Sequence, residues 1–280
     1  MPSIYLNCND SGNSWNKKQY LLAADDRMRL NQFREIKTAT EQPDYVLNIE
    51  PFDFKSGIKW TGIWQIDTLF GSGKAEEWER ADDVFVAISS LPEHLIMFKN
   101  KIKLLFQACD PTFNRRYPEI EPEYDFVVCA SNGDAYRERE RVYEIMEDLF
   151  TYETWGKGRS PQEYSRILNK ARVQFVRSAN TLTADGEIAQ RFFECLAIGP
   201  VLTNWVDDLT QTGLVEGVDY MAYHNDLEMV EKMKLLLDPK IGPKIAENGR
   251  KKALLYHCYE HRAITILNTI NDKYHYSNSL

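Results

Sequence analysis

The segment DGEIAQRFFECLAIGPVLTN (Asp185–Asn204) combines a short helical stretch, a glycine-proline stop and an apolar run. We predict a helix over Gly186–Ala197, ended by Gly199-Pro200, and a strand that begins at Val201. A helix followed directly by a short apolar strand is the repeating unit of a parallel sheet. The segment therefore predicts an α/β fold.

Two charged side chains on this predicted helix indicate a ligand. Arg191 and Glu194 lie three residues apart and share one helical face. Free N–H groups at a helix start attract an anion, and an arginine adds a bidentate, permanently charged contact to phosphate. Glu194 could accept hydrogen bonds from a ribose diol. The pair predicts a binding wall for a sugar nucleotide, with an exposed ion pair between the two side chains as the alternative.

The turn before this helix belongs to the same predicted site. It consists of Asp185, Gly186 and Glu187, whose backbone N–H groups could face the β-phosphate or the sugar hydroxyls. Asp185 could also cap the helix through its side chain, and both interpretations can hold at once.

Outward from this segment, short apolar runs alternate with longer amphipathic stretches, which is typical of an α/β protein with parallel strands. The predicted strands are Ile4–Leu6, Tyr45–Ile49, Gly62–Ile66, Val84–Ile88, Lys103–Phe106, Phe126–Ala130, Thr151–Thr154, Val173–Val176 and Val201–Leu202. The predicted helices are Lys17–Lys37, Glu76–Arg80, Glu93–Asn100, Asp134–Phe150, Pro161–Lys170, Gly186–Ala197, Asp226–Leu237 and Pro243–Tyr259, followed by a last helical segment at Glu260–Tyr274.

The stretch DPTFNRRYPEIEPEYD (Asp110–Asp125) contains three prolines and little periodicity, so we interpret it as an interdomain linker. We predict one domain over residues 1–118 and a second over 119–261, with the helix at 262–280 packing back on the first. Two such domains would be Rossmann-like and face each other across a cleft, with ligands at the carboxyl ends of the strands.

The bulk composition is that of a globular protein. Of the 280 residues, 43% are hydrophobic and 27% charged, and the net charge of −8 argues against a dedicated nucleic-acid binder. The five cysteines are scattered and odd in number, which favours reduced thiols over a disulfide framework. The amino-terminal residues lack a signal-peptide pattern, and no apolar run reaches membrane-spanning length, so we expect a soluble, cytoplasmic protein.

Four further positions are candidate site residues. Asn132 and Gly133 follow the apolar run FVVCA and precede a predicted helix carrying Arg137, a geometry that points N–H groups at a phosphate. A plain loop between strand and helix is the alternative. Asp67 ends the run GIWQI, where a carboxylate could act as a general base on an acceptor hydroxyl or simply cap the next helix.

Three motifs of the second half resemble the group-1 glycosyltransferases of the GT-B fold, within the branch of spore-maturation glycosyltransferases. They are RFFECLAIG (Arg191–Gly199), EGVDYMAYHNDLEMVEKMKLLLD (Glu216–Asp238) and IAENGRKKALLYHCYEHR (Ile245–Arg262). Weaker matches are GIWQIDT (Gly62–Thr68), ADDVFVA (Ala81–Ala87) and QACDP (Gln107–Pro111). The resemblance covers nearly the whole chain.

The resemblance implies a hexosyl- or pentosyltransferase that holds a nucleotide-diphosphate sugar mainly in the second domain and an acceptor mainly in the first. It also implies that no metal or other cofactor is needed, because helix dipoles and cationic side chains neutralise the departing diphosphate. One departure concerns the two glutamates that many members carry eight residues apart: Gly186 stands eight residues before Glu194.

Two alternatives to this function remain open. A degenerate scaffold could bind a sugar nucleotide or glycan without catalysis, and the missing first glutamate favours this hypothesis slightly. The acceptor could be a glycan, a protein, a small molecule or a modified base of viral DNA, the last requiring a basic rim built from residues such as Lys55, Lys59, Arg115 and Arg116. The sequence from His257 to His261 matches the H-x-x-E-H zinc pattern, but no third ligand is evident, so we predict no metal site.

Overall fold

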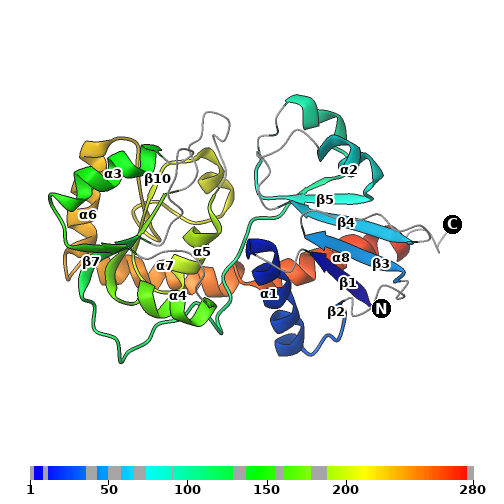
Figure 1. The fold of residues 1–280 in the computed structure, drawn as a ribbon, viewed down its shortest axis with the longest axis horizontal. Coiled ribbons are helices and arrows are strands. Elements are labelled where there is room, and N and C mark those ends of the chain that lie inside the picture. The colour runs from blue at the N-terminus through cyan, green and yellow to red at the C-terminus, as the bar shows by residue number, and fades with distance from the viewer. Residues whose placement is uncertain are drawn as a thin grey trace. The chain divides into compact units, whose positions relative to one another are not determined.

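A computed structural model describes residues 3–8, 12–35, 43–49, 58–65, 74–89, 91, 93–128, 137–154, 160–177 and 188–275. The chain divides into two compact units. Unit 1 comprises Met1–Phe106 and Tyr259–Leu280, and unit 2 comprises Gln107–Cys258. Each unit contains one parallel sheet with helices packed on it, so the predicted α/β class is confirmed (Figure 1).

The sheet of unit 1 has the order β2-β1-β3-β4-β5-β6, and every neighbouring pair is parallel. Its strands are β1 (Ile4–Cys8), β2 (Phe33–Glu35), β3 (Tyr45–Ile49), β4 (Trp60–Gln65), β5 (Asp83–Val86) and β6 (Ile102–Leu104). All five residues of β3 are buried, as expected for an inner strand of a parallel sheet that is covered on both faces.

The helices of unit 1 are α1 (Gly12–Met28), α2 (Lys74–Arg80), the 3-10 helix η1 (Glu93–Phe98) and α8 (Tyr259–His275). Helix α1 packs against α8, where the rings of Tyr20 and Tyr259 lie 4.9 Å apart and Arg27 pairs with Glu260 at 2.6 Å. Segments from the two ends of the chain thus complete one unit.

The predicted helix Lys17–Lys37 is wrong beyond Met28. Arg29 and Asn31 adopt positive φ angles of 54° and 55°, which end the helix, and the chain continues into β2. The Asp25 carboxylate accepts the N–H groups of Gln32 and Phe33 at 2.9 and 3.3 Å and so fixes the turn. Burial of Phe33 in the sheet outweighs the helical preference of the segment.

The sheet of unit 2 is also parallel throughout, with the order β11-β10-β9-β7-β8. Its strands are β7 (Tyr124–Val128), β8 (Tyr152–Thr154), β9 (Ala171–Val176), β10 (Val201–Asn204) and β11 (Met221–Tyr223). Its helices are α3 (Arg137–Glu147), α4 (Pro161–Leu168), α5 (Gln190–Leu196), the 3-10 helix η3 (Asp207–Gln211), α6 (Asp226–Leu237) and α7 (Gly242–Tyr256). A core that includes Phe126, Phe175 and Met233 joins the sheet to α3 and α6.

Candidate functional site

The carboxyl edge of the unit 2 sheet gathers polar and aromatic side chains. Register pairs Thr203 with Val176 and Asn204 with Tyr223, so β9, β10 and β11 end at the same level. The residues that follow these three strand ends are Arg177, Trp205 and His224. Ligands of parallel α/β sheets bind at this edge, because the loops that leave it carry the variable side chains.

Helix α5 presents Arg191 in its first turn. The helix begins at Gln190, so the predicted start at Gly186 is wrong: Ala189 is extended, with φ −60° and ψ 140°, and Ile188 is buried. The Nε of Arg191 donates to the Tyr164 hydroxyl at 3.0 Å. A cation at the start of a helix gains nothing from the helix dipole, so this position suits an arginine that meets an anion.

Glu194 is largely buried on the same helix, with 7% of its surface exposed. Its Oε1 accepts a hydrogen bond from Gln190 Nε2 at 2.7 Å. A carboxylate so removed from water is an effective acceptor for hydroxyl groups, since its hydrogen bonds form in a medium of low dielectric constant. Arg191 and Glu194 are therefore each oriented by a separate neighbour, Tyr164 and Gln190.

The two phenylalanines between them anchor α5. The Phe192 ring meets Tyr220 edge-on at 5.2 Å, and the Phe193 ring lies 5.0 Å from His257. Gly249 of α7 allows close packing, because a Cβ there would lie 2.2 Å from the Asp219 carbonyl oxygen and 2.9 Å from Leu196. The packing of Phe192 and Phe193 therefore fixes the orientation of α5, and with it the positions of Arg191 and Glu194.

Tyr223 at the end of β11 is a buried phenol beside charged groups. Burial raises its pKa to about 12, while the Arg177 guanidinium acts in the opposite direction. The ring of Tyr223 stacks on Phe175 with centroids 6.2 Å apart. Tyr223 therefore stays protonated at neutral pH.

Arg177 is a candidate residue that the sequence analysis did not select. It directly follows the apolar run VQFV, which becomes the end of β9. The same rule that selected Asn132 after FVVCA, a polar residue at the carboxyl end of a strand, would have selected it.

Several predicted site residues lie outside the described part of the chain: Asp67, Asn132, Gly133, Asp185, Gly186 and Glu187. Arg137 is the first residue of α3, the element that follows β7 in the described part of the chain. One turn later, Arg141 forms a bidentate pair with Asp226 at 2.8 and 3.1 Å and thereby ties α3 to the start of α6.

The first histidine of the zinc-like motif, His257, packs inside unit 2. His257 is buried against Phe193, and its carbonyl oxygen accepts the N–H of Cys109 at 2.9 Å. In the described ranges, no three histidine, cysteine, aspartate or glutamate side chains are grouped so that they could hold a metal ion.

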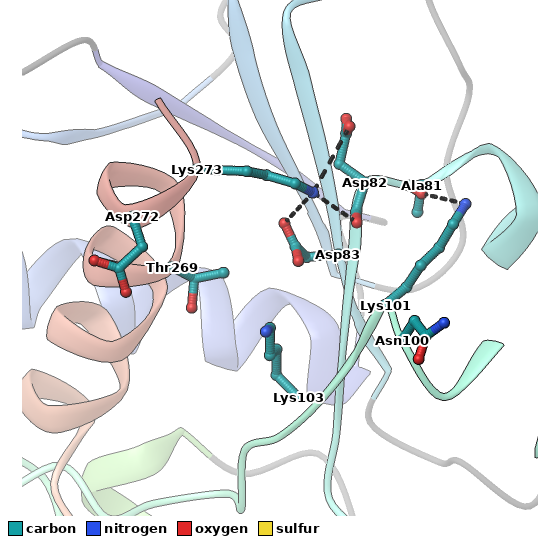
Figure 2. A pocket seen from close by; sticks show the side chains of 9 residues that line it. All are labelled: Ala81, Asp82, Asp83, Asn100, Lys101, Lys103, Thr269, Asp272 and Lys273. Carbon is teal, nitrogen blue, oxygen red and sulfur yellow. Dashed lines mark hydrogen bonds and ion pairs between the residues drawn. The ribbon is translucent and has the colours of Figure 1, made fainter. Parts of the chain in front are cut away.

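A second polar region is a pocket of about 590 Å³ in unit 1, shown in Figure 2. It lies at the amino edge of the sheet, because Asp83 opens β5 and Lys101 directly precedes β6. Lys101 donates to the carbonyl oxygens of Glu79 and Ala81 at 2.6 and 2.8 Å and so caps the end of α2. Lys273 of α8 donates to the Asp83 carboxylate at 3.0 Å.

These contacts make the pocket a structural feature. Its lining contains three lysines and three aspartates, so the charges are matched. The carboxylate of Asp83 is buried and also accepts the Trp60 indole N–H at 2.9 Å. The lysines therefore join α8 and α2 to the sheet, and the candidate site remains the carboxyl edge of unit 2.

We expect replacement of Lys273 by methionine to lower the free energy of unfolding by about 1–2 kcal/mol, because the buried Asp83 carboxylate loses its counter-charge. Urea denaturation of the purified protein measures this difference. Lys103→Met is the matched control, since Lys103 lines the same pocket but no ion pair joins it to another described residue. The free energy of unfolding of this variant should stay within about 0.5 kcal/mol of the wild-type value. Equal losses of unfolding free energy in the two variants would contradict the proposed structural role of the Lys273–Asp83 ion pair.

The comparison that decides the family concerns the carboxyl-terminal part of the chain. A family model described as "Glycosyl transferase-like" matches residues 119–268, which is more than half of the chain. The chain belongs to the glycosyl transferase-like family. Membership of this family identifies the protein as a glycosyltransferase, in agreement with the resemblance of RFFECLAIG and the two later motifs. No curated protein matches the sequence.

Solved glycosyltransferases share the fold of the whole chain at low sequence identity. Sucrose-phosphate synthase from Thermosynechococcus elongatus superposes with a TM-score of 0.65 at 11% identity, over 98% of this chain and 99% of that one. HepE from Anabaena, solved with UDP-glucose, superposes with a TM-score of 0.62 at 8% identity, over 95% of this chain and 99% of that one. An α1,3-fucosyltransferase solved with GDP-fucose superposes with a TM-score of 0.57 at 10% identity, over 96% of this chain and 90% of that one. The fold is GT-B, as predicted.

No helix within the described residues is both long enough and apolar enough to cross a membrane.

Proposed function

We propose that the protein transfers a hexosyl or pentosyl group from a nucleotide-diphosphate sugar to an acceptor hydroxyl without a metal ion. The observation that carries the proposal is the pair on α5. Arg191 is oriented by Tyr164 at 3.0 Å, and the buried Glu194 is oriented by Gln190 at 2.7 Å. A cation and a carboxylate acceptor one turn apart match the diphosphate and the ribose of one ligand.

In the proposed reaction, the acceptor oxygen attacks the anomeric carbon of the donor while the bond from that carbon to the β-phosphate oxygen breaks. Negative charge develops on the departing diphosphate, and Arg191, Arg177 and Arg137 would stabilise it, together with the amides near Asn132 and Gly186. Because three arginines supply the positive charge, the proposed mechanism assigns no step to a metal ion. Glu194 holds the ribose and does not touch the reacting atoms.

The proton of the acceptor hydroxyl needs a base if the reaction inverts the anomeric configuration. We assign this role to Asp67, which comes two residues after the end of β4 in the sequence. Unit 1 would accordingly hold the acceptor.

The donor would carry a uracil or guanine nucleotide, by analogy with HepE, solved with UDP-glucose, and the α1,3-fucosyltransferase, solved with GDP-fucose. Within the family, we retain the spore-maturation branch as the proposed group, on the three motifs quoted above.

The non-catalytic alternative has one specific observation in its favour, the glycine at position 186. A degenerate scaffold would bind the donor and release no diphosphate from it. A DNA-base acceptor is less favoured, because two residues of the required basic rim are engaged: Lys59 pairs with Asp44 at 3.0 Å and Arg116 with Glu247 at 2.8 Å. Such pairs leave little charge for DNA phosphates.

A thermal-shift screen against nucleotide-diphosphate sugars, with a chelator present throughout, tests the proposal. A donor at one hundred times its Kd stabilises the folded state by about 2.7 kcal/mol, which raises the melting temperature by several degrees. We expect UDP- or GDP-sugars to produce this shift and to release the nucleoside diphosphate when an acceptor is supplied. Absence of any shift in well-folded protein would refute donor binding, and a shift that appears only with added divalent metal would refute metal independence.

A further inference from the structure

Cys109 and Cys258 lie side by side in unit 2, although they are 149 residues apart in the sequence. Their Sγ atoms are separated by 3.7 Å, and both side chains are buried. The two residues pair in the manner of parallel strands, and the Cys109 N–H donates to the His257 carbonyl at 2.9 Å. Because backbone hydrogen bonding sets this register, the two sulfurs are held together by the fold.

The backbone spacing already suits a disulfide. Neighbouring strands run about 4.7–4.9 Å apart, which lies within the range of about 4.4–6.8 Å between Cα atoms of disulfide-bonded cysteines. The sulfurs must approach by about 1.7 Å, from 3.7 Å to a bond length of about 2.0 Å. Small rotations about the two Cα–Cβ bonds supply such a movement.

The two cysteines lie at opposite ends of the unit 2 sequence, so a disulfide between them would join these ends. Unit 2 runs from Gln107 to Cys258, so the two thiols lie at its beginning and at its end. Cys258 occupies the short link between α7 and α8, and its neighbours Leu255 and Tyr256 are 51% and 58% exposed. A small oxidant therefore needs only a local opening of this link to reach the sulfurs.

We propose that Cys109 and Cys258 form a redox-sensitive thiol pair, closed by a two-electron thiol oxidant into a disulfide that joins the two ends of unit 2. Both S–H bonds break and one S–S bond forms. The two electrons and two protons pass to the oxidant, and a dithiol reductant reverses the change. Once closed, the bond restrains the unfolded chain of unit 2 within a loop of 149 residues and so stabilises the folded unit.

Diamide, whose N=N group accepts the two hydrogen atoms, is the oxidant for the test. The full-length protein is treated in its native state, alkylated in denaturant and digested without reduction. We expect the oxidised protein to be lighter by two hydrogen atoms when it is weighed before alkylation, and the digest to contain one cross-linked peptide pair with Cys109 and Cys258. The melting temperature of unit 2 should rise by roughly 5–15 °C in calorimetry. Dithiothreitol should reverse all three changes.

Cys109→Ser and Cys258→Ser should each abolish the cross-link and the shift, whereas Cys8→Ser, in β1 of unit 1, should retain both. The wild-type peptide map decides the question even if a buried serine impairs folding. Full alkylation of Cys109 and Cys258 after diamide treatment would overturn the proposal. A disulfide that involves other cysteines, or a cross-link between this pair without a rise in melting temperature, would overturn it equally.

Discussion

Replacing Arg191 by alanine should lower turnover of the nucleotide-sugar donor by about 10²–10³-fold, the usual effect of losing one group that stabilises developing charge. The Arg191 guanidinium lies in the first turn of α5 with its Nε on the Tyr164 hydroxyl, and a guanidinium is a bidentate hydrogen-bond donor to phosphate. Release of nucleoside diphosphate from the donor identified by thermal shift measures the effect. The free energy of unfolding should change by less than about 1 kcal/mol.

Two matched variants separate charge from geometry. Arg191→Lys keeps the charge and loses the planar bidentate fork, so we expect an intermediate loss. Tyr164→Phe leaves Arg191 in place but removes its orienting hydroxyl, which should cost about tenfold or less. The ligand series adds a further control: Arg191→Ala should weaken binding of the nucleoside diphosphate and leave that of the nucleoside unchanged. Wild-type turnover in Arg191→Ala would remove this residue from the site.

Replacing Glu194 by glutamine should weaken donor binding by roughly 10–100-fold, because a neutral amide replaces a charged acceptor of ribose hydroxyls. The substitution keeps the size of the side chain, and a glutamine at 194 can still accept from Gln190 through its carbonyl oxygen, so the fold should be unaffected. Isothermal titration with the nucleoside and the nucleoside diphosphate measures the loss, which should be similar for both ligands.

The ribose assignment has its own control. A 2′,3′-dideoxynucleotide lacks the hydroxyls that Glu194 is proposed to hold, so Glu194→Gln should hardly change its affinity. Gln190→Ala removes the orienting amide, leaves the carboxylate, and should weaken ribose binding less than Glu194→Gln does. If Glu194→Gln lost the same affinity for the ribose and the dideoxyribose ligands, Glu194 would have a packing role instead.

Where local sequence settles structure, the elements were predicted closely. Tyr45–Ile49 and Asp226–Leu237 have the predicted bounds. The first is an apolar run interrupted only by Asn48, and the second follows Asn225, whose side chain accepts the Glu228 N–H at 3.0 Å as a helix cap. The GT-B fold followed from the motif resemblance and is confirmed by the solved structures that share it.

Features that depend on contacts between residues far apart in the sequence could not be predicted from local patterns. The strand β2 was assigned to a helix, because its pairing with Ile4 and the contacts of Asp25 are not visible in a local pattern. The contact of Arg191 with Tyr164 joins residues 27 positions apart on two helices, and no periodicity indicates it. The buried state of Glu194 likewise depends on its surroundings in the folded unit rather than on its own helix.

The division of unit 1 into two stretches of chain determines the order in which the protein is completed during synthesis. Unit 2 is one continuous stretch, whereas unit 1 needs α8, which follows unit 2 in the sequence. Helix α8 contributes Ala263, Ile266 and Ile270, all buried, so the apolar surface they cover meets water until α8 has left the ribosome. The second unit in the sequence therefore matures first, and a nascent chain arrested before Tyr259 would present an unfinished core to chaperones.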